Sequence, residues 1–256
     1  MDVIYFVDGD RVETTANAGG PWDPTMQHGG APSSLAVWAA EQVACAVPMR
    51  VARLTIDLLR PVPVAPLRLR TEVLREGRKI QLVQVSLMSE DKEVARAEVL
   101  KVRRVELELP AGSLPGPLTT AGPSSGQRQS LGERNPFGTG VEVSAIDGSF
   151  RGGGPGKVWF RLHRPVVAGH ANSPAMRAAA TGDFCNGVSS VLDFTKWTYL
   201  NGDLTVSLAR DPVGEWILLE AETLLGPDGC AVASGQLADE MGYFGRATQT
   251  LVIDPR

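Results

Sequence analysis

The feature that most constrains this 256-residue chain is an internal repeat. The segment Leu54–Val62 (LTIDLLRPV) recurs 150 residues later as Leu204–Val213 (LTVSLARDPV), with one extra residue, Asp211, in the turn. An apolar, strand-like run follows each copy, and a helix that begins with proline precedes each copy. A unit written twice predicts two halves that pack against each other, and grooves between packed units are frequent ligand sites.

The spacing of apolar residues gives the two halves the same order of elements. In the first half, a loop rich in Gly and Pro (18–30) leads to a helix over 32–46, where apolar residues recur every three or four positions. In the second half, Asn172-Ser173 before Pro174 is an N-cap signal for a helix over 174–186. The expected strands, in chain order, are 11–15, 50–60, 66–75, 79–89, 92–104, 141–150, 157–167, 196–210, 215–225, 229–238 and 246–254, with a loop at 151–156.

Both predicted helices are rich in small residues, which lets a helix approach a sheet closely. A long helix wrapped by a curved antiparallel sheet is the hot-dog fold. The sequence therefore predicts an α+β protein with a tandem (double) hot-dog architecture, in which two long central helices are wrapped by one continuous sheet. The expected units are residues 1–108 and 141–256, joined by a linker over 109–140 that is rich in Gly, Pro and Ser.

Composition excludes several classes of protein. The net charge of −4 and pI near 5.5 argue against a general nucleic-acid binder. Three cysteines without CxxC spacing predict neither a disulfide framework nor a zinc ribbon, and they fit a reducing, cytoplasmic location. The acidic N-terminus is unlike a signal peptide, and no apolar run is long enough for a membrane span.

Basic residues gather in one part of the first half. Two interpretations stay open for this cluster: a solvated sheet edge, or a patch for the anionic tail of a ligand. Its members are Arg68, Arg70, Arg75, Arg78 and Lys79.

The two predicted helices carry an acidic residue at the same position. Nine residues after the first proline of each helix stand Glu41 and Asp183. Gly182 and Gly187 flank Asp183, although glycine costs about 1 kcal/mol relative to alanine inside a helix. Such glycines indicate either a frayed helix end or a close backbone approach at a functional site, and Asp183 is the stronger candidate of the two acids.

Several stretches, taken together, resemble the acyl-CoA thioesterase II family, and in particular its bacterial thioesterase-like branch of double hot-dog proteins. They are His28-Gly29-Gly30, Arg60-Pro61-Val62, Gly182-Asp183 through Asn186-Gly187, Asn201-Gly202-Asp203-Leu204, Pro212–Trp216 and Gly235–Gln249.

This resemblance implies a catalytic set of three residues. The family's Asp falls on Asp183, its Thr or Ser falls on Asn201, and its Gln falls on Gln249 if one residue is gapped in the Tyr243–Arg246 turn. Without that gap, Gln236 takes the Gln position. An amide at 201 can orient water or donate a hydrogen bond, but it cannot act as a hydroxyl.

Oxyanion contacts and substrate binding are expected at the start of the first helix. Backbone N–H groups at a helix N-terminus can stabilise the negative charge that develops on a thioester oxygen. His28, Gly29 and Gly30 would supply this region, and the turn at Ser173 is a second source of N–H groups. No metal or cofactor is required.

The sequence thus predicts a thioesterase that hydrolyses an acyl-CoA substrate with water activated by Asp183. One alternative is a non-catalytic, regulatory protein that binds acyl-CoA, which Asn201 would favour. A hot-dog dehydratase or enoyl-CoA hydratase is disfavoured, because no His follows Asp183 within the helix. The resemblance also implies a homo-oligomer.

Overall fold

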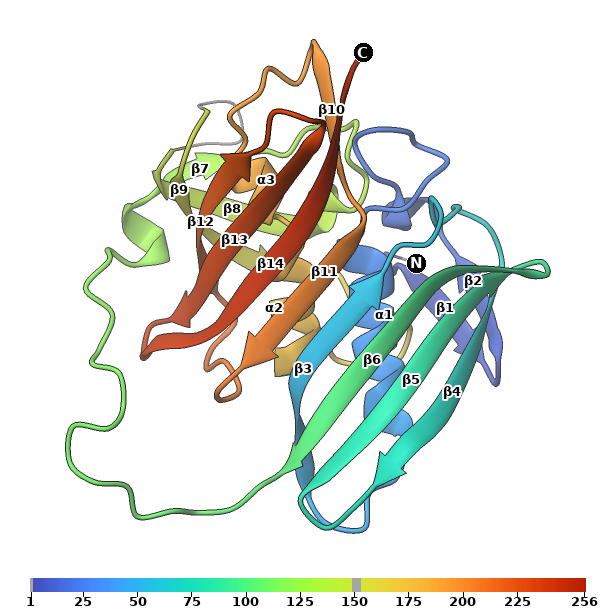
Figure 1. Cartoon of the computed structure of the whole chain (residues 1–256), viewed down its shortest axis with the longest axis vertical. Coiled ribbons are helices and arrows are strands. Elements are labelled where there is room, and N and C mark those ends of the chain that lie inside the picture. The colour runs from blue at the N-terminus through green and yellow to red at the C-terminus, as the bar shows by residue number, and fades with distance from the viewer. Residues whose placement is uncertain (1, 149–152) are drawn as a thin grey trace.

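The computed structural model describes residues 2–148 and 153–256. Fourteen strands form one sheet, and neighbouring strands pair antiparallel wherever the described residues show a ladder (Figure 1). The first six are β1 (Tyr5–Asp8), β2 (Arg11–Thr14), β3 (Met49–Asp57), β4 (Leu67–Glu76), β5 (Ile80–Ser89) and β6 (Lys92–Arg103). The others are β7 (Gln127–Gln129), β8 (Val141–Asp147), β9 (Gly156–Leu162), β10 (Trp197–Asn201), β11 (Asp203–Leu208), β12 (Ile217–Leu225), β13 (Cys230–Asp239) and β14 (Gly242–Pro255).

The two halves meet where β3 pairs with β11, in a sheet ordered β1-β2-β4-β5-β6-β3-β11-β14-β13-β12-β9-β8-β7, with β10 also on β14. At this junction Thr55 lies opposite Thr205, and their hydroxyl oxygens are 3.4 Å apart. A two-fold axis between two copies of one unit would place equivalent residues opposite each other on antiparallel strands. Thr55 and Thr205 are equivalent in this sense, because they are 150 positions apart. The same offset relates the first residues of β4 and β12, of β5 and β13, and of β6 and β14. The sequence repeat is therefore a structural duplication.

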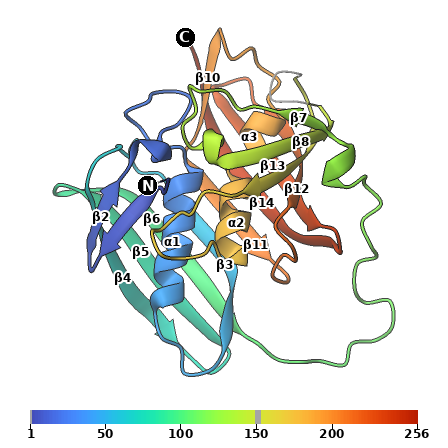
Figure 2. The ribbon, with the colours of Figure 1, turned by 180° about the vertical axis from the view of Figure 1, so that it is seen from behind.

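Two helices, α1 (Gly30–Gln42) and α2 (Pro174–Gly182), pack side by side on one face of this sheet (Figure 2). Their small residues allow close contact, and the Ser34 hydroxyl of α1 donates to the Met176 carbonyl of α2 at 3.1 Å. The helices are antiparallel, so the start of α1 meets the end of α2. The buried faces of both helices and both half-sheets form one continuous apolar core.

The helix expected over 32–46 is present as α1 but ends at Gln42, four residues early, and the helix expected over 174–186 stops at Gly182. A short helix, α3 (Cys185–Val188), follows it. Two contacts explain the break. The Gln249 side chain donates to the Asp183 backbone carbonyl at 3.1 Å. A Cβ at Gly182 would lie 2.8 Å from Val206, so only glycine fits where this end of the helix contacts the sheet.

Other differences from the expected elements are local. The strand expected over 196–210 is divided at Gly202 into β10 and β11, and β1 was not predicted. The segment 109–140 contributes β7 to the sheet and buries Phe137, so part of it packs with the second half; the division into two units and a linker stays a prediction. The end of the strand expected to reach residue 150 and the start of the loop at 151–156 fall outside the described residues. Within the described ranges, no helix combines the length and apolarity that crossing a bilayer requires.

Candidate active site

Asp183 lies buried at the end of α2, where three side chains from other parts of the chain converge on its carboxylate. Its side chain is 3 % exposed. Asn201 Nδ2 donates to Oδ1 at 2.9 Å, and Gln249 Nε2 donates to the same oxygen at 3.0 Å. The Nδ1 atom of His28 lies 2.9 Å from Oδ2. All three residues predicted to form the catalytic set are therefore in contact, together with His28.

Two neighbouring strands deliver the amides. Asn201 ends β10, and it pairs with Leu251 of β14, two residues beyond Gln249. Gln249 is fully buried, and its Oε1 accepts the Asn186 backbone N–H at 3.1 Å while its Nε2 donates to Asp183. Gln249 therefore ties Asp183, α3 and the sheet together.

Gln236, the rival for the glutamine position, does not reach the carboxylate. It lies exposed on β13, opposite Glu220 and Arg246. Because neighbouring Gly235 packs inward against Cys185, alternation along the strand points Gln236 to the outer face. The geometry thus selects Gln249.

The start of α1 closes the site from the other side. His28 stacks on Phe137 with ring centroids 4.7 Å apart, and it lies at the same distance from the ring of Phe184. The same Nδ1 of His28 lies 3.1 Å from the Gly30 nitrogen. It accepts the Gly30 N–H when it carries no proton and donates to Asp183 Oδ2 when it carries one, so only one of these two hydrogen bonds forms at a time. Phe137 was not singled out from the sequence, because it stands in a segment with the composition of a linker.

Gly29 packs directly against the carboxylate. A Cβ at this position would lie 2.6 Å from Oδ1 and 2.8 Å from Oδ2 of Asp183, distances that real Cβ atoms do not adopt. The backbone of Gly29 is helical (φ −57°, ψ −26°), so it is the space beside Asp183, rather than an unusual conformation, that requires glycine.

The two expected sources of an oxyanion hole are not equivalent. Ser173 caps the start of α2, at the opposite end of that helix from Asp183, so its turn cannot serve the same reacting group. At the start of α1, the Gly30 N–H is within hydrogen-bond distance of His28 Nδ1, whereas the Gly29 N–H has no hydrogen-bond partner among the described residues. This leaves Gly29 as the better-placed donor.

Glu41 is the structural counterpart of Asp183, at the end of α1 beside Ser173 at the start of α2. Its environment is different. Partial desolvation raises the pKa of Glu41 to about 7, the Ser173 hydrogen bond opposes this, and the residue remains exposed. The duplicated position therefore carries an acid in both halves, but only Asp183 is enclosed by donors.

The carboxylate of Asp183 retains capacity for one more partner. An ionised carboxylate offers about four lone-pair positions. Two protein donors use Oδ1 and one contact uses Oδ2, so one position on Oδ2 remains. The side-chain oxygen of Asn201 also has no hydrogen-bond partner among the described residues. Both acceptors are available to a water molecule.

Cys185, two residues after Asp183, is not a nucleophile. It is fully buried, and desolvation together with the nearby Asp183 carboxylate raises the pKa of its thiol far above the usual value. Because the thiolate is the reactive form, we expect iodoacetamide to label exposed Cys230 in the native protein and to leave Cys185 unmodified, as read by peptide mass spectrometry. Rapid labelling of Cys185 without unfolding would contradict this assignment.

In the described ranges, no three His, Cys, Asp or Glu side chains form a group that could hold a metal ion.

The arrangement defines a class: a double hot-dog protein with one enclosed carboxylate at the junction of its two helices. Comparison with protein families agrees. Residues 18–102 match the acyl-CoA thioesterase N-terminal domain, and residues 115–253 match the acyl-CoA thioesterase C-terminal domain. The chain belongs to this acyl-CoA thioesterase family.

Solved structures show the same fold at low sequence identity. A hot-dog protein of unknown function from Alicyclobacillus acidocaldarius is 18 % identical with a TM-score of 0.77, over 98 % of this chain and 95 % of that one. The tesB protein of Mycobacterium avium subspecies paratuberculosis is 17 % identical (TM-score 0.70, 97 % and 95 % covered). Acyl-CoA thioesterase II TesB2 of Mycobacterium marinum is 14 % identical (TM-score 0.67, 98 % and 94 % covered). No curated protein matches the sequence.

Proposed function

We propose that the protein hydrolyses acyl-CoA thioesters to free acid and CoA, with Asp183 as the general base. The observation that carries this proposal is the enclosed carboxylate, held by Asn201, Gln249 and His28, with one acceptor position left on Oδ2. A carboxylate in a fixed orientation can take a proton from a water molecule that attacks an activated carbonyl.

The reaction balances with water and the carboxylate alone. Asp183 accepts one proton from the water, and the water oxygen bonds to the thioester carbonyl carbon. The Gly29 N–H meets the resulting oxyanion. The C–S bond then breaks, CoA leaves as the thiolate, and the proton held by Asp183 passes to the leaving sulfur, which restores the carboxylate.

The surrounding residues divide into two roles. Asn201 fixes Asp183 through its Nδ2 and offers its Oδ1 to the water. Gln249 and His28 are positioning residues, since both ends of the Gln249 amide and the Nδ1 of His28 are already engaged by the protein. An amide at position 201 therefore supports the same water without a hydroxyl.

A small, mainly apolar hollow lies beyond Gln249 along the same strands. Its volume of about 10 Å³ holds about one water molecule, so an acyl chain would enter only if its walls move apart. Leu251 and Ile253 follow Gln249 at two-residue spacing on β14, and Tyr199 precedes Asn201 in the same way on β10. Residues two apart on a strand share a face, so the side chains that form the site continue directly into the pocket walls. An acyl chain that extends from Asp183 in this direction would have to displace these side chains.

The test is a panel of acyl-CoAs of different chain lengths, with release of free thiol as the readout. Turnover of at least one acyl-CoA supports the proposal. The main alternative is an acyl-CoA-binding protein without catalysis, which the absence of a hydroxyl at 201 favours. Saturable binding of acyl-CoA with no thiol released across the panel would establish that alternative.

Replacing Gln249 with alanine is expected to lower kcat by about 10- to 100-fold, because a hydrogen bond to a charged group is worth about 1.5–3 kcal/mol. The loss also leaves the Asn186 N–H without its acceptor, so the melting temperature should fall. The matched control is Gln236→Ala on the outer face, which should keep kcat within about twofold since surface changes have small effects. Equal kcat values for the two variants would remove Gln249 from the site.

A further inference from the structure

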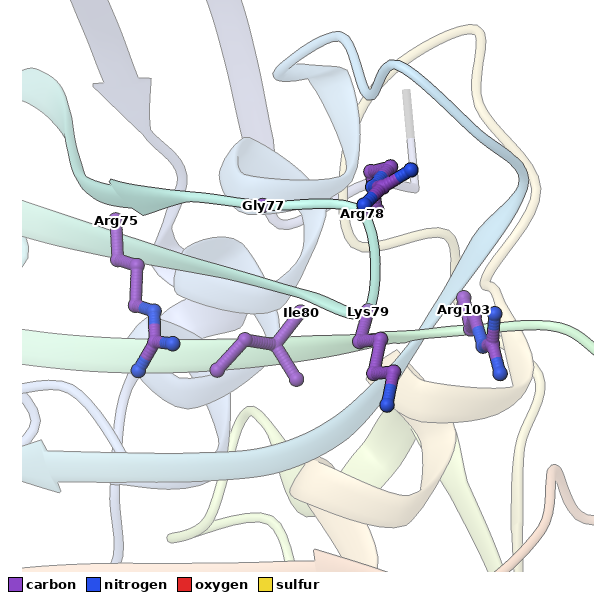
Figure 3. Close-up of a pocket in the computed structure, with 6 residues that line it drawn as sticks. All are labelled: Arg75, Gly77, Arg78, Lys79, Ile80 and Arg103. Carbon is purple, nitrogen blue, oxygen red and sulfur yellow. The ribbon is translucent and has the colours of Figure 1, made fainter.

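A second pocket lies on the turn between β4 and β5, remote from Asp183. It has a volume of about 500 Å³ and is lined by four cationic side chains, one glycine and one apolar side chain (Figure 3). The lining residues are Arg75, Gly77, Arg78, Lys79, Ile80 and Arg103. Small-molecule pockets have volumes of about 300–1,000 Å³, so this one has the size for a ligand rather than a single ion.

The pocket is on the outer face of the sheet. Gln81 points inward, where its Nε2 donates to the Ala44 carbonyl just beyond the end of α1. Its neighbour Ile80 therefore points outward, and Arg75, opposite Leu82, is on the same side. In Figure 3, Arg75, Lys79 and Arg103 extend to the same side as Ile80, and Arg78 lies at the turn.

The pocket is separate from the proposed active site. Asp183 touches the start of α1, whereas the turn of this hairpin lies past the end of that helix. Thirteen helical residues span about 20 Å, and the sheet also stands between the two places. The pocket is therefore not part of the carboxylate site.

The four cations are not neutralised by the protein. In the described part of the chain, none of them makes an ion pair or a side-chain hydrogen bond. The nearest acid in sequence, Glu76, accepts a hydrogen bond from Gln81 Nε2, and among the described residues it forms no ion pair with any of the four cations. Four like charges around one hollow repel one another and attract anions.

The duplication shows that the fold does not need these charges. The equivalent hairpin joins β12 and β13, and the positions 150 residues after the four cations hold no basic residue. They are Leu225, Asp228, Gly229 and Ile253. One copy of the unit forms the same hairpin without these cations. Folding therefore does not explain the cluster in the other copy, whereas binding of an anionic ligand would.

We propose that this pocket binds the phosphate groups of a nucleotide. Guanidinium groups recognise phosphates through bidentate hydrogen bonds and also stack on planar rings, and Ile80 adds an apolar wall for a base. Two sources share this chemistry: a free nucleotide, or the phosphorylated nucleotide end of a CoA molecule. The binding does not depend on thioesterase activity; only the second source rests on the proposed function.

The experiment measures binding of ADP, adenosine 3′,5′-bisphosphate, CoA and inorganic phosphate to the full chain by calorimetry at low salt. We expect saturable 1:1 binding of at least one nucleotide, weakened by added salt because exposed charges are screened. The double variant Arg75→Gln/Lys79→Gln should weaken it at least tenfold. The matched control is Arg68→Gln/Arg70→Gln, exposed on the same strand outside the pocket, which removes the same charge and should change affinity less than twofold.

Competition and kinetics then distinguish the two sources. If the pocket holds the nucleotide end of a separate CoA molecule, saturating CoA displaces the bound nucleotide, and the pocket variant loses affinity for CoA and nucleotide together while KM for acyl-CoA stays the same. If it holds a free nucleotide, KM for acyl-CoA also stays the same, but saturating CoA does not displace the nucleotide. Absence of saturable binding by every phosphate compound, or equal losses in pocket and control variants, overturns the proposal whatever the thioesterase assay shows.

Discussion

The Asp183→Asn variant is expected to lose about 10²- to 10⁴-fold in kcat for acyl-CoA hydrolysis, the range that a positioned general base contributes. Asparagine keeps the shape of the side chain, and its oxygen can still accept from Asn201 and Gln249. Its amide cannot take a proton from water at neutral pH. The fall in kcat should therefore occur without loss of the folded state, which circular dichroism and the melting temperature report.

Glu41→Gln is the matched control for this variant. It changes the corresponding carboxylate at the end of the other helix, where the residue is exposed and no amide pair encloses it. We expect kcat to stay within about twofold of the parent, in line with surface substitutions away from a site. If the Asp183→Asn variant kept the kcat of the parent, another group would have to activate the water. The chain could still be a thioesterase in that case.

The duplicated fold could be predicted from the sequence because the repeat falls on the junction itself. Residues around Thr55 and Thr205 must fit a strand that faces its own copy, so the two segments retain similar sequences. The long strands also alternate or run apolar over eight or more residues, a strong local signal. Short β1 has only four residues and lacked that signal.

The end of the second helix and the wall of the site depend on contacts between distant segments. A sequence window over 174–186 shows helical spacing, but not the Gln249 side chain that takes the Asp183 carbonyl. Likewise, a segment rich in Gly and Pro gives no reason to expect that Phe137 stacks on His28. Gly182 did mark a close approach, although the sequence could not identify Val206 as the residue that approaches it.

The same reasoning explains why two glutamines, Gln236 and Gln249, were both candidates for the site. Gln236 and Gln249 lie on neighbouring strands, and the family pattern reaches Gln249 only with a one-residue gap, so the sequence alone does not decide which of them faces the site. The side chain of Gln249 is buried and that of Gln236 is exposed. The residues around each glutamine do not predict this difference. Register between strands, set by tertiary pairing, decides the question.

Gly29→Ala is expected to destabilise the protein by about 1–3 kcal/mol, as overpacking of a tight site does, and to lower kcat/KM for acyl-CoA at least tenfold. The added Cβ would lie 2.6 and 2.8 Å from the two oxygens of Asp183, so the carboxylate or the start of α1 must move. The sign is informative. At a helical backbone position such as this one, exchanging glycine for alanine normally stabilises by about 0.4–1 kcal/mol. Denaturant unfolding and steady-state kinetics measure both effects.

Two further variants separate the contact from a general effect of alanine. Gly202→Ala, next to Asn201, adds a Cβ with no atom within 4 Å and should leave stability nearly unchanged. In an Asp183→Ala background the opposing oxygens are gone, so Gly29→Ala should lose most of its destabilising effect, and the double-mutant cycle should give a coupling energy of about 0.5–3 kcal/mol. Additive effects in that cycle would mean that Gly29 is required for a reason other than the close approach of the carboxylate.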